Sequence, residues 1–536
     1  MQPTLEETRQ FMEQGEYRVI PFSREIPADL CTPIQVLAIL KNAGNHCFLL
    51  ESMEDSRRWG RYSFLGYDPK LLITCENGQL AVEKVFAGGE TEGKGCAGEQ
   101  RTEKGCRRSV FHTERPQEKI REILREYRAP ALPNLPSLAG GLVGYFAYDS
   151  IKYSELSLKL DARDQEGFKD LDLMLFDKII AFDHLKQKMR LICNKKIRPG
   201  LSPGELREDA KKELDAMERL LRNGEARIPA GRLTSPFRAL FDEEAYCAMV
   251  EKAKHYIYEG DIFQVVLSNR LEADFEGSLF NAYRHMRVNN PSPYMFYFSG
   301  SSVEIAGASP ETLVKLENGV LHTFPLAGTR PRGKDAPEDA ALEKELLADE
   351  KERAEHNMLV DLGRNDLGRI SEFGSVQVER YMDVVKYSHV MHLASVVRGE
   401  IRPDRDALDA VAAVLPAGTL SGAPKIRACQ IINELENNKR GIYGGAIGYL
   451  DFTGNMDTCI AIRIAFQKNG RVFVRSGAGI VADSVPQKEY RECINKAQAV
   501  VDALGYNSAQ ACADRKNVIQ DRFGEDGRGG DNDSAD

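Results

Sequence analysis

The sequence predicts an α+β fold built largely from antiparallel strands. Stretches with strand character come in runs, and helical stretches are inserted between them in blocks, which is typical of α+β domains. Residues 474–486, VRSGAGIVADSVP, contain G-x-G but no G-x-G-x-x-G, and no βαβ unit follows, so they are not a dinucleotide fingerprint. The sequence also shows no internal repeat. These observations argue against a doubly wound parallel sheet.

The first 195 residues are predicted to form an N-terminal region dominated by strands. A short helix is expected over 1–20, and a second over about 32–42, where Thr32 and Pro33 supply an N-cap and a first-turn proline. The pair Asn77-Gly78 indicates a hairpin turn. Strands are predicted at 47–52, 61–69, 70–85, 140–150 and 172–184.

Segments without apolar periodicity divide the chain. Residues 87–107, AGGETEGKGCAGEQRTEKGCR, predict a mobile surface insertion. Residues 196–240 are predicted to hold a charged helix, at about 203–223, followed by a linker. A second region covers 241–505, and the polar residues 506–536 form a tail that we expect to be disordered.

Composition narrows the class of protein. The 536 residues are 42% hydrophobic and 29% charged, as in ordinary soluble globular proteins. A net charge of −9 disfavours nonspecific nucleic-acid binding, which needs a basic surface. No segment resembles a signal peptide or approaches the length of a membrane span. The eleven scattered cysteines, without a C-x-x-C pair, indicate reduced thiols, and we predict a cytoplasmic protein that binds neither nucleic acid nor membrane.

Two glutamate pairs are the most informative motif. Glu352 and Glu355 lie three residues apart, as do Glu489 and Glu492 much later in the chain. On a helix, residues with this spacing share a face, so each pair can present two carboxylates in one direction. Hard oxygen ligands suit Mg²⁺, which retains positions for water or an anionic substrate. The alternative for each pair alone is a solvated helix face.

Other polar residues interrupt apolar segments. Gln264 lies in the strand-like run GDIFQVVLSNR, where a satisfied buried amide is the alternative to a functional role. Glu311 follows Ser309-Pro310 and is interpreted either as a buried acid or as a carboxylate at a helix N-terminus. Arg463 lies among Ile and Ala in what we interpret as an inner strand, within a Gly-rich hairpin at 441–466 that also holds Tyr443. A charge in such surroundings must be paired or face a ligand.

Three further segments leave alternatives open. TFPLAGTRPRG (323–333) is interpreted as a loop whose two arginines either bind a carboxylate or are solvated. The alternation in 384–399 predicts one strand, with His389 and His392 on opposite faces and therefore poorly placed to share a metal. LPAGTLSGAPKIRACQII (415–432) is a loop entering a helix near Pro424, where backbone amides either meet an anion or are simply capped.

Taken together, these motifs resemble the chorismate-utilising enzymes, and most closely the anthranilate-forming branch of that family. PLAGTRPRG, AEHNMLVDLGRND, YSHVMHL, GTLSGAPK, YGGAIGY and SGAGIVADS occur in the family's order, and the resemblance spans about 17–505. It implies two intertwined antiparallel sheet regions with outer helices, and an active site within the C-terminal part.

The resemblance also implies a set of site residues. Glu355 and Glu492 are expected to be Mg²⁺ ligands, with Glu352 and Glu489 beside them. Arg463 and Tyr443 are expected to hold a carboxylate of chorismate, together with the amides around Gly477 and Gly479, in a site lined by Thr329 and Thr419. For the catalytic roles, Glu311 is our candidate general acid and His392 matches the histidine tied to pyruvate elimination.

Three positions separate the branches of the family, and one is His392, whose presence argues against a protein that stops at the aminated intermediate. Gln264 stands where water-using members carry a Lys base, which favours an amine nucleophile. Ala327 stands where aminodeoxychorismate synthases typically carry Lys, which favours the anthranilate series. The aminodeoxychorismate synthases remain the alternative within the family.

Partners follow from the same resemblance. The chain contains no amidotransferase module with a catalytic Cys, so ammonia is expected from a separate glutamine amidotransferase subunit, in a heterotetramer. A regulatory pocket for tryptophan is also implied, since LLES (49–52) and NPSPYMFY (290–297) resemble the family's tryptophan site. The expected lining residues are Glu51, Ser52, Pro291, Tyr294 and Met295. The alternative is ordinary strand packing.

Overall fold

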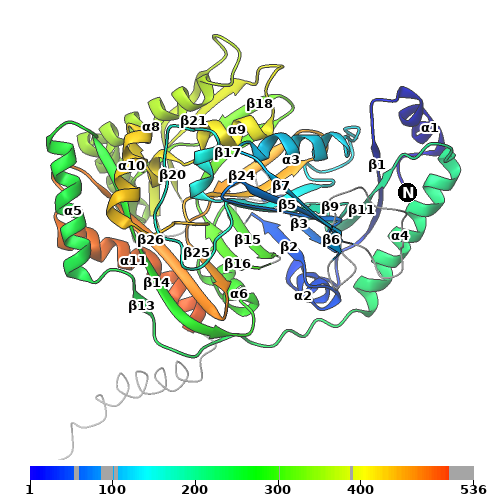
Figure 1. The fold of residues 1–536 in the computed structure, drawn as a ribbon, viewed down its shortest axis with the longest axis horizontal. Helices are drawn as coiled ribbons and strands as arrows, with labels where there is room; N and C mark the ends of the chain where they lie inside the picture. Colours follow the sequence, from blue (N-terminus) through cyan, green and yellow to red (C-terminus); the bar gives the residue numbers. More distant parts are fainter. Residues whose placement is uncertain (53–59, 86–99, 102–106, 301, 387–389, 506–536) are drawn as a thin grey trace, which may run out of the picture.

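The computed structural model describes residues 1–52, 60–85, 100–101, 107–300, 302–386 and 390–505. Two large sheets, each with strands from both halves of the chain, form the centre of the molecule, and the helices lie around them (Figure 1). The predicted insertion 87–107 lies outside the described residues except for 100–101 and 107, and the predicted tail 506–536 lies outside them entirely.

The first sheet combines strands from both halves of the chain, in antiparallel pairs. Its order is β1 (Val19–Pro27), β11 (Lys188–Lys196), β10 (Lys178–Asp183), β3 (Tyr62–Tyr67), β2 (Cys47–Glu51), β15 (Tyr294–Ser299), β16 (Glu304–Ser309), β25 (Ile464–Lys468), β26 (Arg471–Ile480), β14 (Gln264–Glu276) and β12 (Arg232–Leu233), with β13 (Arg238–Ala239) and β22 (Gly422–Ala423) also pairing with β14.

The second sheet is built in the same way. Its order is β19 (Leu326–Pro331), β21 (Val390–Glu400), β18 (Val320–Thr323), β17 (Thr312–Glu317), β24 (Met456–Ile460), β23 (Ala446–Asp451), β8 (Gly141–Phe146), β9 (Leu171–Phe176), β4 (Leu71–Glu76), β5 (Gln79–Lys84), β7 (Arg107–His112) and β6 (Gln100–Arg101), with β20 (Gln377–Lys386) pairing with β21. Because each sheet takes strands from both halves of the chain, the intertwined α+β fold that the sequence predicted is confirmed.

The helices cover the sheets from outside. They are α1 (Leu5–Gln14), α2 (Pro33–Ala43), α3 (Pro116–Arg125), α4 (Pro203–Asn223), α5 (Glu243–Tyr258), α6 (Phe280–Asn289), α7 (Ala336–Ala348), α8 (Glu350–Gly368), α9 (Ala407–Val414), α10 (Lys425–Glu436) and α11 (Pro486–Gly505), with 3₁₀ turns at Tyr148–Tyr153 and Gly418–Leu420. Figure 1 places α5, α10 and α11 at one end of the molecule and α1 and α4 at the other. In the described residues, no helix is long and apolar enough to cross a membrane.

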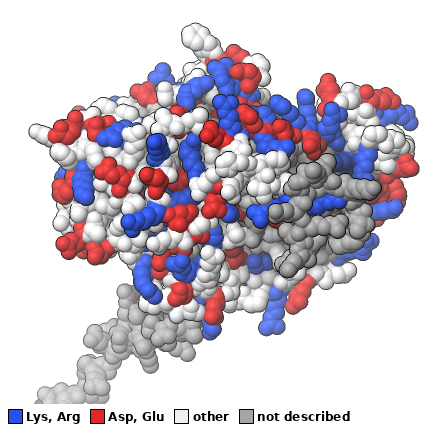
Figure 2. Space-filling view, viewed as in Figure 1, with Lys and Arg blue, Asp and Glu red and all other residues white. Residues whose placement is uncertain are grey.

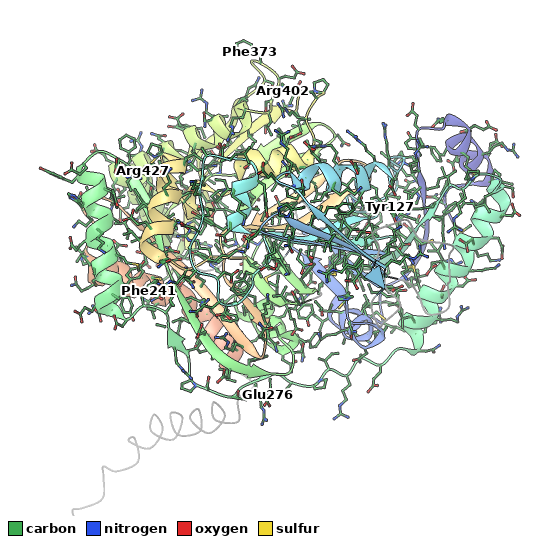
Figure 3. The ribbon with its side chains drawn as sticks, in the orientation of Figure 1. Tyr127, Phe241, Glu276, Phe373, Arg402 and Arg427 are labelled. Atoms are coloured by element: carbon green, nitrogen blue, oxygen red, sulfur yellow. The ribbon has the colours of Figure 1, made fainter. Side chains whose placement is uncertain are left out.

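The hydrophobic core has an inner layer between the sheets and outer layers beneath the helices. Phe48 and Phe296 of the first sheet pack in one buried cluster with Tyr145 and Ile447 of the second. Separate clusters bury α2, α4 and α6 against the first sheet and α3 and α9 against the second. Figure 3 shows Phe373 and Arg402 at one edge of the molecule and Glu276, the last residue of β14, at the opposite edge. The two sheets thus form the frame of the molecule, and the helices pack on its outside.

Local signals set several boundaries. The Thr32 side chain accepts a hydrogen bond from Gln35 N at the start of α2, and Asn77 and Gly78 both have positive φ in the turn between β4 and β5. Two expectations were wrong in detail. The helix expected over 1–20 is confined to α1, and 172–184 holds two strands of different sheets, β9 and β10, rather than one.

Candidate active site

At two points where the chain crosses from one sheet to the other, a carboxyl group and a guanidinium group lie side by side. The chain passes from β16 to β17 through Glu311, and from β24 to β25 through Arg463. Backbone hydrogen bonds hold both crossovers, from Ile460 N to Glu311 O (3.0 Å) and from Ala308 N to Arg463 O (3.2 Å). Arg463 was expected inside a strand, and this was wrong. It lies between strands with φ +51°, where the chain changes sheets.

Glu311 is a half-buried acid in the segment between β16 and β17. No helix follows it, so the alternative of a helix N-terminus was wrong. Desolvation raises its pKa from 4.5 to about 7, although a hydrogen bond from Thr419 Oγ1 (3.1 Å) and the charge of Arg463 both act to lower it. A carboxyl group with a pKa near neutrality can hold a proton and release it at physiological pH.

The His392 ring is oriented by the neighbouring strand β19. Thr329 and His392 are directly opposite in the register of β19 and β21. His392 Nδ1 lies 2.9 Å from Gly328 O and 3.1 Å from Thr329 Oγ1. Because a carbonyl oxygen only accepts, Nδ1 carries the proton in the neutral ring and Nε2 is left as a base. Burial lowers the pKa of His392, which favours this neutral form.

The strand expected over 384–399 is in fact the end of β20 and all of β21 except Glu400. His389 lies outside the described residues, so its expected placement relative to His392 remains a prediction. The segment 323–333 was expected to be a loop, but its residues 326–331 form strand β19. Arg330 binds Glu345 and Asp349, and Arg332 binds Asp339. Both guanidinium groups are therefore engaged with carboxylates of this chain.

The glutamate pairs lie on α8 and α11, and one lysine links them. Lys496 Nζ lies 2.7 Å from Glu492 Oε1 and also acts electrostatically on Glu355, Glu489 and Glu311. Lys351 acts on both Glu355 and Glu489. The two remote segments thus face one charged centre, although the Glu492 and Lys496 side chains remain about half exposed.

The oxygen atoms of these four glutamates are suitable ligands for a hard divalent cation. Desolvation and the neighbouring Glu352 raise the pKa of Glu355, and desolvation and Glu492 raise that of Glu489. Positive charge between these carboxylates would relieve the repulsion, and carboxylate oxygens are the ligands that Mg²⁺ prefers. In the described part of the chain, however, no three His, Cys, Asp or Glu side chains are already gathered closely enough to form a metal site.

Two glycines of β26 leave the backbone without side chains beside these acids. On β26, Gly477 and Gly479 are opposite Ser268 and Val266 of β14. A Cβ atom on Gly479 would lie 2.7 Å from Gln264 Nε2, and one on Gly477 would lie 3.0 Å from the hydroxyl of Tyr443. Gln264 is buried and its side chain hydrogen-bonds to Glu355. A Cβ on Gly477 would also lie 2.8 Å from Leu267 O, so only glycine fits there, whereas a Cβ on Gly479 would push the Gln264 side chain aside.

The predicted catalytic, substrate-binding and metal-binding residues therefore form one connected set. Arg463 acts on both His392 and Glu311, Thr419 binds Glu311, and Lys496 Nζ donates to Gly477 O at 3.2 Å. We call this set, with Lys496, the junction site. Sequence reasoning missed Lys496. The signal was its position four residues after Glu492, which places both on the same face of a helix.

A buried charge network supports the junction site and was also missed. Glu436, Arg440 and Arg475 are each no more than 3% exposed. Glu436 accepts hydrogen bonds from Arg440 Nε (3.0 Å) and Arg475 Nη2 (2.8 Å), and the Arg440 guanidinium lies over the Tyr443 ring at 5.8 Å. Burial alone would raise the pKa of Glu436, but the two arginines outweigh it and hold the pKa below its usual value. One uncompensated positive charge remains beneath Tyr443, which suits an anionic ligand.

The residues of the predicted regulatory pocket lie elsewhere. Glu51, Ser52, Pro291, Tyr294 and Met295 all line a cavity of about 1480 Å³. Glu51 and Met295 are opposite each other on β2 and β15, so the two motifs are also strand neighbours. Glu51 accepts hydrogen bonds from Tyr283 (2.8 Å) and Arg287 (2.8 Å), and the Tyr294 hydroxyl donates to Asp457 at 2.9 Å. The cavity reaches Leu326 and Ser395 of the strands that carry Thr329 and His392.

The surface carries mixed charge. On the face shown in Figure 2, basic and acidic side chains are interspersed, in line with the totals of 72 and 81 in the sequence. The eight cysteines that the structure describes are unpaired.

Comparison with known proteins yields consistent matches. Residues 88–502 match the model of a family described as chorismate binding enzymes. The chain is 44% identical over 509 residues to anthranilate synthase component 1 of Acetivibrio thermocellus, covering 94% of this chain and 98% of that protein. It is 43% identical over 505 residues to the protein of the same name from Aquifex aeolicus, covering 94% and 97%.

Solved structures agree. Anthranilate synthase component I from Streptococcus pneumoniae superposes with a TM-score of 0.68 at 39% identity, covering 89% of this chain and 98% of that one. The menaquinone-specific isochorismate synthase from Escherichia coli has a TM-score of 0.62 at 20% identity, covering 93% and 98%, which shows a shared fold.

Proposed function

The chain belongs to the chorismate-binding enzyme family, and on that premise we propose that it converts chorismate and ammonia into anthranilate and pyruvate, a step of tryptophan biosynthesis. The relatives named anthranilate synthase component 1 match nearly the whole chain. The observation that carries the proposal is the convergence of the α8 and α11 carboxylates on Lys496, in electrostatic contact with Glu311. A lyase that eliminates hydroxyl and pyruvate from an anionic ring needs such a combination of metal ligands, acid and base.

In this proposal Glu355 and Glu492 would hold Mg²⁺, and Glu352 and Glu489 would lie beside it. When bound, the cation would offset the negative charge of a ring carboxylate of the substrate. Arg463 and the amides around Gly477 and Gly479 bind the second carboxylate, and Tyr443 supports that end of the site. Thr329 and Thr419 line the site. Holding both carboxylates orients the ring, which by itself removes much of the entropic barrier to the reaction.

Proton transfers are assigned to the two groups with perturbed pKa values. Protonated Glu311, whose pKa is about 7, donates to the hydroxyl that leaves C4 as ammonia attacks C2. Neutral His392, with Nε2 unprotonated, then takes the ring proton as the enolpyruvyl group leaves as pyruvate. Gln264 has no basic group with which to activate a water molecule, and this supports ammonia as the nucleophile.

The second candidate, aminodeoxychorismate synthase, is disfavoured by Ala327. This residue lies on β19, two positions before Thr329. Its methyl group cannot attack the ring, whereas a lysine there could capture it covalently.

A partner and a regulator complete the proposal. The name component 1 of the relatives points to a second component, and we propose a glutamine amidotransferase subunit, assembled with this chain into a heterotetramer. Tryptophan is proposed as a feedback inhibitor bound among Glu51, Ser52, Pro291, Tyr294 and Met295, which line the large cavity. The unpaired cysteines support a reducing compartment, and we propose the cytoplasm.

One assay tests the reaction. The protein is incubated with chorismate, Mg²⁺ and ammonium at alkaline pH, and anthranilate fluorescence and pyruvate are followed together. Equal amounts of both products are expected, and EDTA should abolish them. An aminated product that keeps its enolpyruvyl group, without pyruvate, would instead identify an aminodeoxychorismate synthase. No turnover of chorismate would refute both.

A further inference from the structure

A buried histidine that has no part in the proposed reaction fastens α8 to the second sheet. His356 follows Glu355 directly and is fully buried. Its Nε2 lies 2.7 Å from Ser395 Oγ on β21, and its Nδ1 has no partner in the described residues. Ser395 lies three residues after His392, on the opposite, buried face of the strand. The bond therefore joins the helix of the glutamates to the strand of His392.

The same serine also stabilises an irregular part of β20. The register between β20 and β21 shifts between Arg380 and Asp383, and Met382 there has φ +54°. Ser395 Oγ accepts a hydrogen bond from Met382 N at 3.0 Å. The neighbouring Tyr381 hydroxyl donates to Asn357 Oδ1 on α8 at 2.5 Å. Two successive residues of α8 are thus tied to this bulge, directly or through Ser395.

These bonds control how α8 can turn about its axis. A helix rotates by about 100° per residue, so a fixed His356 also fixes the direction of its neighbour Glu355 and of Glu352 one turn earlier. Breaking a buried hydrogen bond leaves an unsatisfied polar group, so a rotated helix is disfavoured.

We propose that His356 is a positioning residue, which acts through Ser395 to hold the carboxylates of Glu352 and Glu355 at a fixed orientation toward the strand of His392. This inference rests on the proposed function, because it assigns those carboxylates to a metal. Partners that orient metal ligands typically contribute about 10–100-fold to metal affinity. His356 acts through the helix backbone, so we expect the lower end of that range.

The experiment compares four variants with the unmodified full-length chain. His356→Leu removes the bond, Ser395→Ala removes it from the other side, and His356→Gln retains a polar atom within reach of Ser395. Tyr153→Phe is the control, since it removes a hydrogen bond to Asp170 (2.6 Å) in the N-terminal region. Two quantities are measured: the Mg²⁺ concentration for half-maximal ammonia-dependent turnover, and the rise in Tm that Mg²⁺ alone produces without substrate.

His356→Leu and Ser395→Ala should each raise the half-saturating Mg²⁺ concentration about tenfold and reduce the Mg²⁺-induced rise in Tm. His356→Gln should restore most of both, and Tyr153→Phe should lower Tm while leaving both unchanged. A lower Tm with unchanged Mg²⁺ response in His356→Leu would overturn the inference. If that variant does not fold, Ser395→Ala decides alone. If the unmodified chain shows no Mg²⁺ response at all, the proposed metal site fails, and the inference fails with it.

Discussion

Replacing Glu311 by glutamine separates the role of this acid in the reaction from its effect on stability. Burial raises the pKa of Glu311 from 4.5 to about 7. The folded protein therefore binds this proton more tightly than the unfolded chain does. The resulting stability is complete below pH 4.5 and is lost as the pH rises through 7. Because a change of one in pKa corresponds to 1.36 kcal/mol, the whole contribution is at most about 3 kcal/mol.

Between about pH 5.5 and about pH 8.5 the wild-type chain should lose about 2 kcal/mol of unfolding free energy through this group alone. Glu311→Gln cannot ionise, so its stability relative to wild type should improve by that amount over the same interval. Urea unfolding at the two pH values measures the difference. Glu251→Gln, at an exposed position on α5, is the control and should change by the same small amount at both.

The activity of Glu311→Gln should move in the opposite direction. Losing a general acid typically costs about 10²–10⁴-fold in rate, and at a fixed concentration of free ammonia the wild-type rate should decline above about pH 7 as the acid ionises. If Glu311→Gln is more stable than wild type at high pH but turns over much more slowly, Glu311 is both a desolvated carboxyl group and the general acid. If the stability difference does not depend on pH, the carboxyl group is solvated in the folded protein and the reasoning is wrong.

Three further outcomes are expected. His392→Ala should slow pyruvate release by about 10²–10⁴-fold while chorismate is still aminated, so chromatography should detect an intermediate that keeps its enolpyruvyl group; parallel loss of amination and elimination would contradict this role. Glu51→Gln should abolish inhibition by tryptophan with ammonia-dependent turnover retained, and inhibition curves that match wild type would refute the pocket. Glu436→Gln should lower the unfolding free energy by about 3–5 kcal/mol, because the buried guanidinium groups of Arg440 and Arg475 lose their carboxylate partner. Glu434→Gln, on the exposed face of the same helix, should change the unfolding free energy little.

Local signals explain where sequence reasoning succeeded. The helix predicted at 203–223 coincides with α4 because Ser202 and Glu205 form a capping box and Pro203 occupies the first turn. The hairpin at Asn77-Gly78 follows from the positive φ that both residues adopt. In each case the determining contacts lie within four residues along the chain, so the sequence contains all of the needed information.

Predictions failed where the deciding contact is distant in sequence. The apolar run 172–184 has the pattern of one buried strand, but Asp177 divides it between two sheets, and no local feature reveals that the partners change from β4 and β8 to β3 and β11. The same limit applies to Arg463. Its apolar neighbours suggested an inner strand, whereas the left-handed backbone that carries the chain between sheets depends on how the sheets meet.

In the candidate site, some features follow from local sequence signals and others from contacts that are distant in sequence. The i, i+3 spacing of the glutamates could be read from the sequence, because a helix fixes which side chains share a face. It could not show what each face meets, so the buried Glu436 network went unnoticed, whereas Lys496 on α11 could have been found from its i, i+4 spacing to Glu492. Glu311 gains its raised pKa from burial at a crossover, and Arg463, at the other crossover, acts on both Glu311 and His392. The chemistry of the junction site therefore arises from the pairing of the two sheets, and a change that loosens this pairing should lower the pKa of Glu311 by exposing its carboxyl group to water.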